Sequence, residues 1–405
     1  VLHTPEDAYP GPYTYKRFWF RDAAFIIHAL LALGLEARAR RAIECFFARQ
    51  TPLGYFRSQE GEWDSNGEVL WLLDRYRRLQ GEGVPAHWRE PVDRAARWIS
   101  RKCLPESPVT PHAGLLPAGF SAEHLGPNDY YYWDDFWSIA GLRAAAAILA
   151  DDADAAQRAG AAADRLAAAV DRSLASARER LGRPAMPAAP YRRLDAGAIG
   201  SVAAGYPLQL FAADDERLLD CVRYLLDECF VDGAFFQDMI HSGQNAYLTL
   251  QVAQVLLRAG DPRYLELMDA VARLASPTGQ WPEAIHPQTG GGCMGDGHHV
   301  WAAAEWVLML RYCFLREEGD TLVLASGVPA RWLAAGEPVS FGPAPTTFGP
   351  VTVRVAPEAA GRVRVSWEAR WHREAPALRV SLPGYTACGD DGDSDSVLLE
   401  PRQRA

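Results

Sequence analysis

The sequence lacks the features that mark nucleic-acid-binding and membrane proteins. No run of lysine and arginine is interleaved with aromatic residues, and the 405 residues carry a net charge of -10, so a basic surface for nucleic acid is not expected. Apolar stretches such as 23–33 are too short and too interrupted to span a bilayer. The first twenty residues lack the charged-then-apolar order of a signal peptide. We therefore expect a cytoplasmic protein without nucleic-acid or membrane partners.

The positions of the seven cysteines do not indicate a metal-binding motif. They occur at positions 45, 103, 221, 229, 293, 313 and 388, an odd number without the spacing of metal ligands. Most lie on apolar helical faces, so buried, reduced thiols are expected, and neither a metal nor a cofactor is predicted. The chain begins at Val1 in a polar, proline-rich stretch, which is compatible with a piece of a longer product. The oligomeric state is left open.

What is present is material for a large helical core. Hydrophobic residues make up 49% of the chain and charged residues 23%, so a core of considerable size can form. Between residues 18 and 315 one unit repeats: an apolar helix, a tight turn, an amphipathic helix and a long loop. The helices are expected at 19–33 with 36–50, 65–80 with 88–103, 133–149 with 152–176, 199–211 with 214–228, 240–259 with 261–275, and 297–316.

Eleven helices in alternating pairs predict a ring. The first helix of each pair would line the inside and the second would pack outside, giving an all-α (α/α)6 toroid of six hairpins with one helix missing. Short β-branched runs at 321–324, 352–355, 363–367 and 378–381 predict a small antiparallel β domain after it. We therefore expect two domains, 1–318 and 319–405. The acidic stretch 389–396 is interpreted as a solvated loop, because it lacks the closing glutamate of a calcium site.

The lengths of the loops point to one end of this ring. Turns within hairpins are short, whereas the connections between hairpins are long, at 51–64, 104–132, 177–198, 229–239 and 276–296. In an up-and-down ring, all the long connections fall at the N-terminal ends of the inner helices. Loops of this length in a compact domain are usually functional. A site is therefore expected at that end.

Several of these loops end in an aromatic residue next to a carboxylate. The sets are Trp19 to Asp22, Trp63-Asp64, Tyr130 to Trp137, and Trp281-Pro282-Glu283. Helix capping explains any one of them, but the ring would gather all of them around one mouth. Cleavage of a glycosidic bond needs an acid, a base or nucleophile, and aromatic walls that contact the sugar. The joint pattern therefore favours a sugar-processing site.

The candidate residues follow from this pattern. The candidate catalytic residues are Asp134, Asp135 and Glu283. The candidate substrate-binding residues are Trp19, Arg21, Asp22, Trp63, Asp64, Tyr132, Trp133, Trp137, Trp281, His298 and His299. Adjacent histidines on a helix point about 100° apart, so these two are not expected to share a metal; one of them is expected to contact substrate or phosphate. Glu305 is interpreted as structural.

One segment resembles a known family. The stretch from Pro282 to Gly292, followed by Gly295-Asp296-Gly297 and Trp301, resembles the loop that carries the catalytic base in trehalases, glucoamylases and related (α/α)6-barrel glycosidases. The resemblance implies that Glu283 is the base that activates water. The full trehalase signatures are absent, so trehalose itself is not favoured as the substrate.

Two further motifs share the resemblance. Trp133-Asp134-Asp135 is similar to the tryptophan-carboxylate motif of the general acid in these families, which implies Asp134 as the acid and Asp135 as its neighbour or substitute. Arg21-Asp22 looks like the pair that holds the hydroxyls of the terminal sugar. Trp63-Asp64 also looks like the acid motif of trehalases, so the acid is a choice among Asp134, Asp135 and Asp64.

These observations favour an inverting, exo-acting glycoside hydrolase that cleaves an α-glucosidic or related oligosaccharide bond. Three alternatives remain. In a sugar phosphorylase, His298 or His299 and the loop 290–297 would hold phosphate. An epimerase of the same helical architecture would place a histidine at the chemistry. The non-enzymatic alternative is a carbohydrate-binding ring that has lost its catalytic activity.

Overall fold

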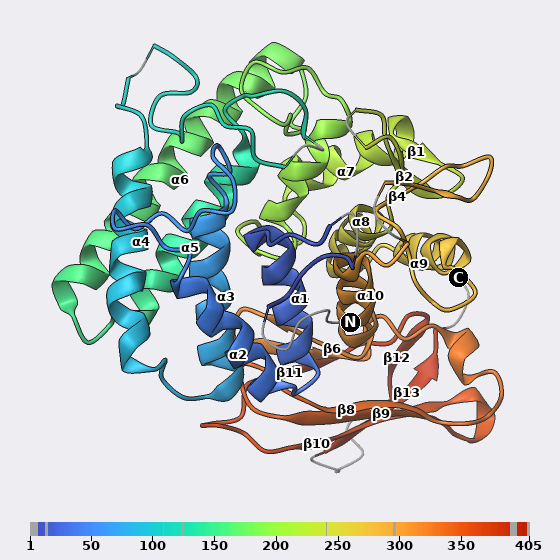
Figure 1. The fold of residues 1–405 in the computed structure, drawn as a ribbon. Helices are drawn as coiled ribbons and strands as arrows, with labels where there is room; N and C mark the ends of the chain where they lie inside the picture. Colours follow the sequence, from blue (N-terminus) through green and yellow to red (C-terminus); the bar gives the residue numbers. More distant parts are fainter. Residues whose placement is uncertain are drawn as a thin grey trace.

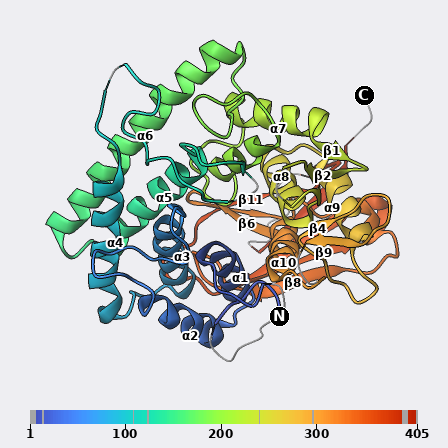
Figure 2. The same cartoon turned by 45° about the horizontal axis from the view of Figure 1, so that its top comes forward.

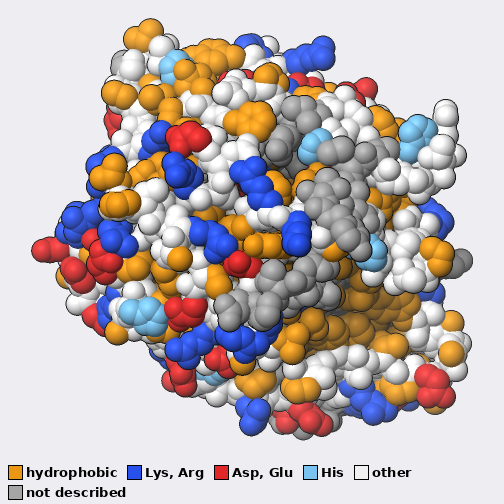
Figure 3. Space-filling model, in the orientation of Figure 1, with side chains coloured by type: hydrophobic (Ala, Val, Ile, Leu, Met, Phe, Trp, Pro, Cys, Tyr) orange, Lys and Arg blue, Asp and Glu red, His pale blue; other side chains and the backbone are white. Residues whose placement is uncertain are grey.

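A computed structural model of the chain describes residues 7–12, 15–107, 109–122, 125–239, 241–294, 297–388 and 395–402. Helices form the upper part of the molecule and a β layer lies beneath them (Figure 1). On the face drawn in Figure 3, basic and acidic side chains are interspersed over the helical part. Within the described ranges, no helix is both long and apolar enough to cross a membrane. Most of the acidic stretch 389–396, and the pair Gly295-Asp296, lie outside the described residues.

The predicted helical pairs follow one another along the chain, and its largely helical character is confirmed. They are α1 (Phe20–Ala32) with α2 (Glu36–Phe47), α3 (Ser65–Gln80) with α4 (Arg89–Lys102), α5 (Tyr132–Ile148) with α6 (Ala153–Leu181), the 3₁₀ helix η3 (Ala196–Ala204) with α7 (Glu216–Glu228), α8 (Ala246–Ala259) with α9 (Tyr264–Leu274), and the unpaired α10 (Val300–Phe314).

The first members of the pairs pack against one another. α1 contacts α3 and α10, α3 contacts α5, α5 contacts η3, η3 contacts α8, and α8 contacts α10, so these contacts form a circuit. The second members pack on it: α2 on α1, α4 on α3 and α5, α6 on α5, α7 on η3, and α9 on α8. In Figure 2, α1, α3 and α10 lie near the centre, whereas α2, α4 and α6 lie further out.

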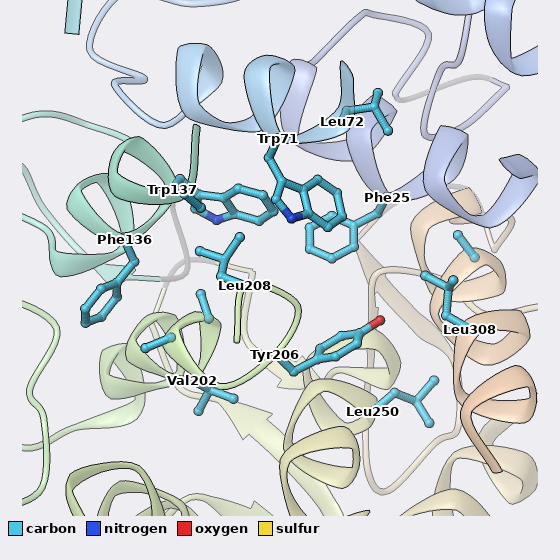
Figure 4. Close-up of a cluster of buried hydrophobic side chains, with 14 of the residues drawn as sticks. Phe25, Trp71, Leu72, Phe136, Trp137, Val202, Tyr206, Leu208, Leu250 and Leu308 are labelled. Carbon is cyan, nitrogen blue, oxygen red and sulfur yellow. The ribbon is translucent and has the colours of Figure 1, made fainter. Parts of the chain in front are cut away.

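Large side chains fill the centre of this circuit. Figure 4 shows Phe25 of α1, Trp71 of α3 and Trp137 of α5 pointing into the same space as Tyr206 and Leu250. The Trp71 and Trp137 rings meet edge to face, with centroids 5.4 Å apart. Burial of such aromatic rings contributes much of a core's stability. The middle of the circuit is therefore packed.

Caps define several helix ends. α6 begins after Asp152, whose side chain accepts a hydrogen bond from the backbone N–H of Ala155. Gly81 directly follows α3 and Gly260 directly follows α8, and both are in the left-handed region, with φ of 71° and 74°. A glycine adopts this conformation without the steric cost that a Cβ would bring.

Two predicted helices differ from the observed ones. The α-helix expected at 199–211 is the 3₁₀ helix η3, which ends at Ala204. Its glycines disfavour an α-helix and allow a close approach, because a Cβ at Gly200 would lie 2.5 Å from Leu125 Cδ2. The helix expected at 240–259 begins only at Ala246. The residues before it form a strand, and Asn245 caps the helix by accepting from Leu248 N.

A small sheet at the N-terminal ends of the inner helices was not predicted. Its strands are β1 (Phe230–Val231), β2 (Ala234–Gln237), β3 (Gly243–Gln244), β4 (Ala284–Ile285) and β5 (Gly292–Met294), in that order. The sheet joins two long connections that are distant in sequence. Because β4 begins directly after Glu283, this pairing fixes the backbone at the proposed base.

The β layer consists of two further sheets. The strands are β6 (Leu315–Glu318), β7 (Thr321–Leu324), β8 (Val339–Ala344), β9 (Val351–Pro357), β10 (Val363–Ala369), β11 (Ala377–Val380), β12 (Tyr385–Ala387) and β13 (Ser396–Pro401). One sheet, β12-β13-β10-β9-β8, is antiparallel as predicted. In the other, β11-β7-β6, β11 runs parallel to β7, so the predicted antiparallel domain contains one parallel pair of strands. The long connection through β8, β9 and β10 makes parallel pairing possible.

Candidate active site

One small pocket gathers residues from several of the predicted loop ends. It opens at the N-terminal ends of α1, α8 and α10. Its free volume is about 40 Å³, which holds one or a few water molecules. The lining residues are Pro10, Tyr15, Trp19, Arg21, Asp22, His241, Tyr247, Glu283, His299 and Trp301.

Helix starts bring these side chains together. Trp19 is the residue before α1, and Arg21 and Asp22 lie in its first turn. Tyr247 lies in the first turn of α8, and His299 directly precedes α10. Helix N-termini carry partial positive charge and favour carboxylates nearby. The fold therefore creates a place that suits acidic side chains.

Glu283 is held by three side chains. Tyr247 donates a hydrogen bond of 3.1 Å from its hydroxyl to Oε1. The hydroxyl of Tyr15 donates to Oε2, and Nδ1 of His241 lies 3.3 Å from the same oxygen. Glu283 is only 4% exposed. Its carboxyl group is thus fixed in orientation with little contact to bulk solvent.

Asp22 shares the pocket with Glu283. Burial raises the pKa of Asp22 to about 8; the Arg21 charge opposes this rise, and the Glu283 charge adds to it. Nε2 of His299 lies 3.7 Å from Oδ1 of Asp22. The ring of His299 stacks on that of Tyr247, with centroids 5.1 Å apart. Two carboxyl groups close enough to influence each other therefore face one small space.

Behind the pocket, Arg21 forms a buried ion pair with Asp64. Nη2 and Nε of Arg21 lie 2.7 and 2.8 Å from Oδ2 of Asp64. Glu62 and Glu68 lie near the same guanidinium, at 3.9 and 4.0 Å. Burial, and next the Asp64 charge, raise the pKa of Glu68 well above its usual range. One arginine thus faces several carboxyl groups, which favours protonation of some of them.

The two adjacent aspartates at the start of α5 have different neighbours. Asp134 is fully buried and accepts a hydrogen bond from Ser121 Oγ on Oδ1, while its Oδ2 has no hydrogen-bond partner among the described residues. Burial, and then the Asp64 charge, raise the pKa of Asp134 well above its usual range. Asp135 accepts from the backbone N–H of Leu116 at 2.9 Å and so anchors the preceding loop.

Several predicted substrate-binding residues do not reach the pocket. Trp63 donates to the backbone oxygen of Ala118, and the ammonium group of Lys102 lies 3.7 Å from the centroid of its ring. Trp281 is buried and donates to the backbone oxygen of Val271. Both indoles are therefore held within the protein framework.

Tyr132 and Trp137 of α5 are also held within the protein framework and do not reach the pocket. Tyr132 is buried and its hydroxyl is 2.8 Å from Ser173 Oγ of α6. Trp137 points into the packed core (Figure 4). His298 is exposed and does not line the pocket, whereas His299 does. Trp133 lies next to the pocket, because its indole donates to Asp64.

The pocket also contains residues that the sequence did not single out as candidates. They are Pro10, Tyr15, His241 and Tyr247, together with Trp301, which appeared only within the resembling segment. Tyr15 lies four residues before Trp19 in the sequence. Tyr247 lies two residues after Asn245, the cap residue of α8. The capping pattern at Asn245 was a signal for Tyr247. No local pattern marks His241, which has positive φ in a loop.

Among the described residues, no cluster of three His, Cys, Asp or Glu side chains could hold a metal ion.

Solved structures of similar fold include several glycosidases. A bacterial glucoamylase complexed with acarbose aligns with a TM-score of 0.57 and 16% identity, over 73% of this chain. The chain spans 49% of that enzyme. The glucoamylase of Saccharomycopsis fibuligera aligns with a TM-score of 0.58 and 12% identity, over 76% of this chain and 88% of the other. A glycosidase variant in complex with glucose gives 0.56 and 16%, over 76% and 91%.

These likenesses confirm the resemblance to six-hairpin glycosidases at the level of the fold. No protein-family model matches the chain, and no curated protein matches it in sequence.

Proposed function

We propose that this chain is a glycoside hydrolase with Glu283 as its catalytic base. The supporting observation is the pocket in which Glu283 and Asp22, distant in sequence, share one space with Trp19 and Arg21. Carboxyl groups with aromatic walls are the equipment of glycosidic hydrolysis. Tyr15, Tyr247 and His241 orient the Glu283 carboxylate. The free space beside it suits the water molecule that a base would activate.

We assign the general acid to Asp134. A general acid must keep its proton at the working pH, and the raised pKa of Asp134 meets this need. Asp135 is engaged by the loop backbone at Leu116. Asp64 is engaged by the guanidinium of Arg21. Asp135 also has a raised pKa and a carboxyl oxygen without a hydrogen-bond partner among the described residues. The choice of Asp134 therefore rests on its interaction with the charges of Asp64 and Arg21 beside the pocket, which Asp135 does not share.

Entry of a sugar requires movement. The pocket has room for water but not for a sugar ring, and Asp134 is fully buried. Tyr15 occupies the space beside Glu283, so in the proposed reaction its side chain moves aside when substrate enters. Trp19, which is partly exposed, then offers an apolar ring face to the sugar.

The architecture that we propose is a six-hairpin (α/α)6 barrel at 1–318 followed by a β domain at 319–405. The circuit of inner helices supports the barrel. Within the described part of the chain α10 has no second helix paired with it, and β6 and β8 contact α10 instead. The β layer thus covers part of the barrel.

The reaction that we propose is inverting and exo-acting, on an α-glucosidic or related oligosaccharide. Its support is the likeness to glucoamylases, one of them solved with acarbose, and to a glycosidase solved with glucose. In an inverting enzyme the two carboxyl groups stand about 6.5 to 9.5 Å apart, with the water between base and sugar.

The first test is hydrolysis of a panel of α- and β-glucosides, followed by reducing-sugar release. Glu283→Gln should abolish turnover and leave the urea unfolding midpoint close to that of the wild type. Turnover retained in this variant would exclude Glu283 as the base. Sugar binding by calorimetry without product from the wild type would identify a non-catalytic ring. A sugar phosphate formed only with added phosphate would identify a phosphorylase.

The second test identifies the acid through the leaving group. Asp134→Asn should slow hydrolysis of oligosaccharides strongly but spare aryl glycosides, because an acidic phenol leaves without protonation. Asp135→Asn is the matched control, with the same chemical change one residue away. If Asp135→Asn shows the leaving-group dependence and Asp134→Asn does not, the assignment is reversed. The anomer released first, read by NMR, tests inversion.

A further inference from the structure

A second cavity lies at the opposite ends of the inner helices. Its volume is about 360 Å³, and it is formed by the C-terminal halves of α3 and α5, the 207–210 turn, and the junction of α10 with β6. Trp71 and Leu208, which project toward the core in Figure 4, also line it. This cavity shares no lining residue with the pocket around Glu283.

Four arginines line this cavity: Arg75, Arg77 and Arg78 from α3, and Arg143 from α5. Arg77 is paired with Asp74, with Nη2 2.6 Å from Oδ1. The side chains of Arg78 and Arg143 have no hydrogen bond or ion pair within the described part of the chain. The cavity therefore carries excess positive charge, in a chain whose net charge is -10.

Arg75 is not neutralised either. Its Nη2 lies 3.9 Å from Oε1 of Glu317, but that carboxylate is engaged by Arg311 through contacts of 2.8 and 3.0 Å. Nε of Arg75 is buried and has no hydrogen-bond partner among the described residues. A buried guanidinium N–H without an acceptor is costly, so an acceptor is needed here.

Helix electrostatics explain only part of this cluster. Basic residues in the last turn of a helix are favoured by its dipole, which accounts for Arg77 and Arg78 in α3. The same effect does not account for Arg75 and Arg143, which lie further from their helix ends. Partial desolvation of the guanidinium, and next the charge of Arg75, lower the pKa of Arg78, whereas the charges of Asp74 and Glu317 oppose this shift. The guanidinium groups thus repel one another across a space that an anion would stabilise.

His28 provides an independent sign of a ligand. It lines the cavity, is 1% exposed, and its Nδ1 is buried without a hydrogen-bond partner among the described residues. Burial, and then the Arg75 charge, lower its pKa well below the usual range, so the ring is neutral. Its ring packs edge to face on Trp71, with centroids 5.0 Å apart. A neutral histidine can donate one hydrogen bond to an anion.

We propose that this cavity binds a small molecule that carries a phosphate group. Guanidinium groups suit phosphate because they form paired, charge-assisted hydrogen bonds to its oxygens. Arg75, Arg78 and Arg143 supply these donors. Trp71 and Tyr312 line the same space and offer faces to a ring such as a sugar. The volume lies in the range of small-molecule sites. The proposal does not rest on the proposed hydrolase function.

The test is calorimetric titration of the full chain with inorganic phosphate and with glucose 6-phosphate. At least one probe should bind the wild type, and Arg78→Gln with Arg143→Gln should weaken it at least tenfold. Both side chains are exposed, so the double variant should keep the wild-type unfolding midpoint. Tighter binding of glucose 6-phosphate would identify a phosphorylated sugar as the ligand, and equal binding would identify free phosphate; both support the site.

The matched control is Arg158→Gln with Arg165→Gln, which removes the same charge from exposed positions of α6. Binding should stay within twofold of the wild type in this pair. Three results would overturn the proposal: no binding of either probe, binding unaffected by the Arg78 and Arg143 substitutions, or equal weakening by the control pair. The titration repeated with Glu283→Gln should be unchanged, which keeps this result separate from the fate of the hydrolase proposal.

Discussion

The indole Nε1 of Trp133 donates a 2.8 Å hydrogen bond to Oδ2 of Asp64. The same oxygen accepts from Nε of Arg21 at 2.8 Å. The contact links the starts of α1, α3 and α5, three neighbouring inner helices. Trp133 therefore supports the ion pair that fixes Arg21 in the wall of the pocket.

Asp64→Asn should destabilise the protein by about 3 to 5 kcal/mol, because it removes the carboxylate that lies closest to the buried Arg21 charge. Trp133→Phe should cost about 1 kcal/mol, since it removes one hydrogen bond and keeps most of the ring. Urea unfolding measures both. Equal losses in the two variants would mean that the Arg21 charge is compensated elsewhere.

The raised pKa of Asp22 should make stability depend on pH. In the folded state the pKa of Asp22 is about 8, compared with an ordinary value of 3.8 for this side chain, so Asp22 keeps its proton over this range. Between these values the folded state binds a proton that the unfolded state has lost, so stability falls as pH rises. Urea unfolding from pH 5 to 8 should show this fall, with a shallower slope in Asp22→Asn.

Other buried carboxyl groups add to the same trend, because the pKa values of Asp134 and Glu68 are also raised. The informative quantity is therefore the difference in slope between the wild type and Asp22→Asn. An unchanged slope would show that Asp22 ionises in the folded protein as it does in the unfolded chain. The carboxyl band in infrared spectra provides a direct check.

The helical pairs could be predicted because their signal is local. Apolar spacing along α1 or α8, and stops such as Gly260, are visible within a dozen residues. The five-stranded sheet at the pocket could not be predicted. Its strands β3 and β4 are two residues long, and they pair although they lie about forty residues apart in the sequence. Short strands of this kind are defined by their partners and have no periodicity of their own.

The sequence predicted that the loop ends carrying Glu283, Arg21 and Asp22 would meet, and these residues line one pocket in the structure. Their roles stay predictions. The aromatic-carboxylate pattern could not distinguish Trp19, which lines the pocket, from Trp63, which packs beneath Lys102. The direction of a side chain at a helix start depends on the residue at which the helix begins. Helix boundaries predicted from a sequence are in error by about two to four residues. Asp134 and Asp135 are indistinguishable in sequence for the same reason.

Glu305 was predicted to be structural, and its contacts suggest a measurable role. It accepts hydrogen bonds from Tyr206, Gln251 and Trp301 inside the core. Glu305→Leu should cost about 3 kcal/mol or more, because it leaves three buried donors without an acceptor. Tyr206→Phe, which removes only one donor, should cost about 1 kcal/mol. Thermal unfolding compares them, and similar losses would argue against a shared acceptor.

Two glycines allow the close approach of α3 and α5. A Cβ at Gly67 would lie 2.4 Å from the backbone carbonyl of Trp137, and one at Gly141 would lie 2.7 Å from Cα of Gly67. Gly67→Ala should therefore cost about 1 to 3 kcal/mol through overpacking. The substitution should also displace Asp134, which lies in the first turn of α5. Activity should therefore fall together with stability.

Gly160 of α6 is the matched control, because a Cβ there would meet no atom within 4 Å. Gly160→Ala should stabilise the protein by about 0.5 to 1 kcal/mol, since alanine loses less backbone entropy in a helix. Urea unfolding of the two variants should therefore give shifts of opposite sign. A stabilising effect of Gly67→Ala would show that α3 and α5 can separate without cost, and that their contact does not fix the start of α5.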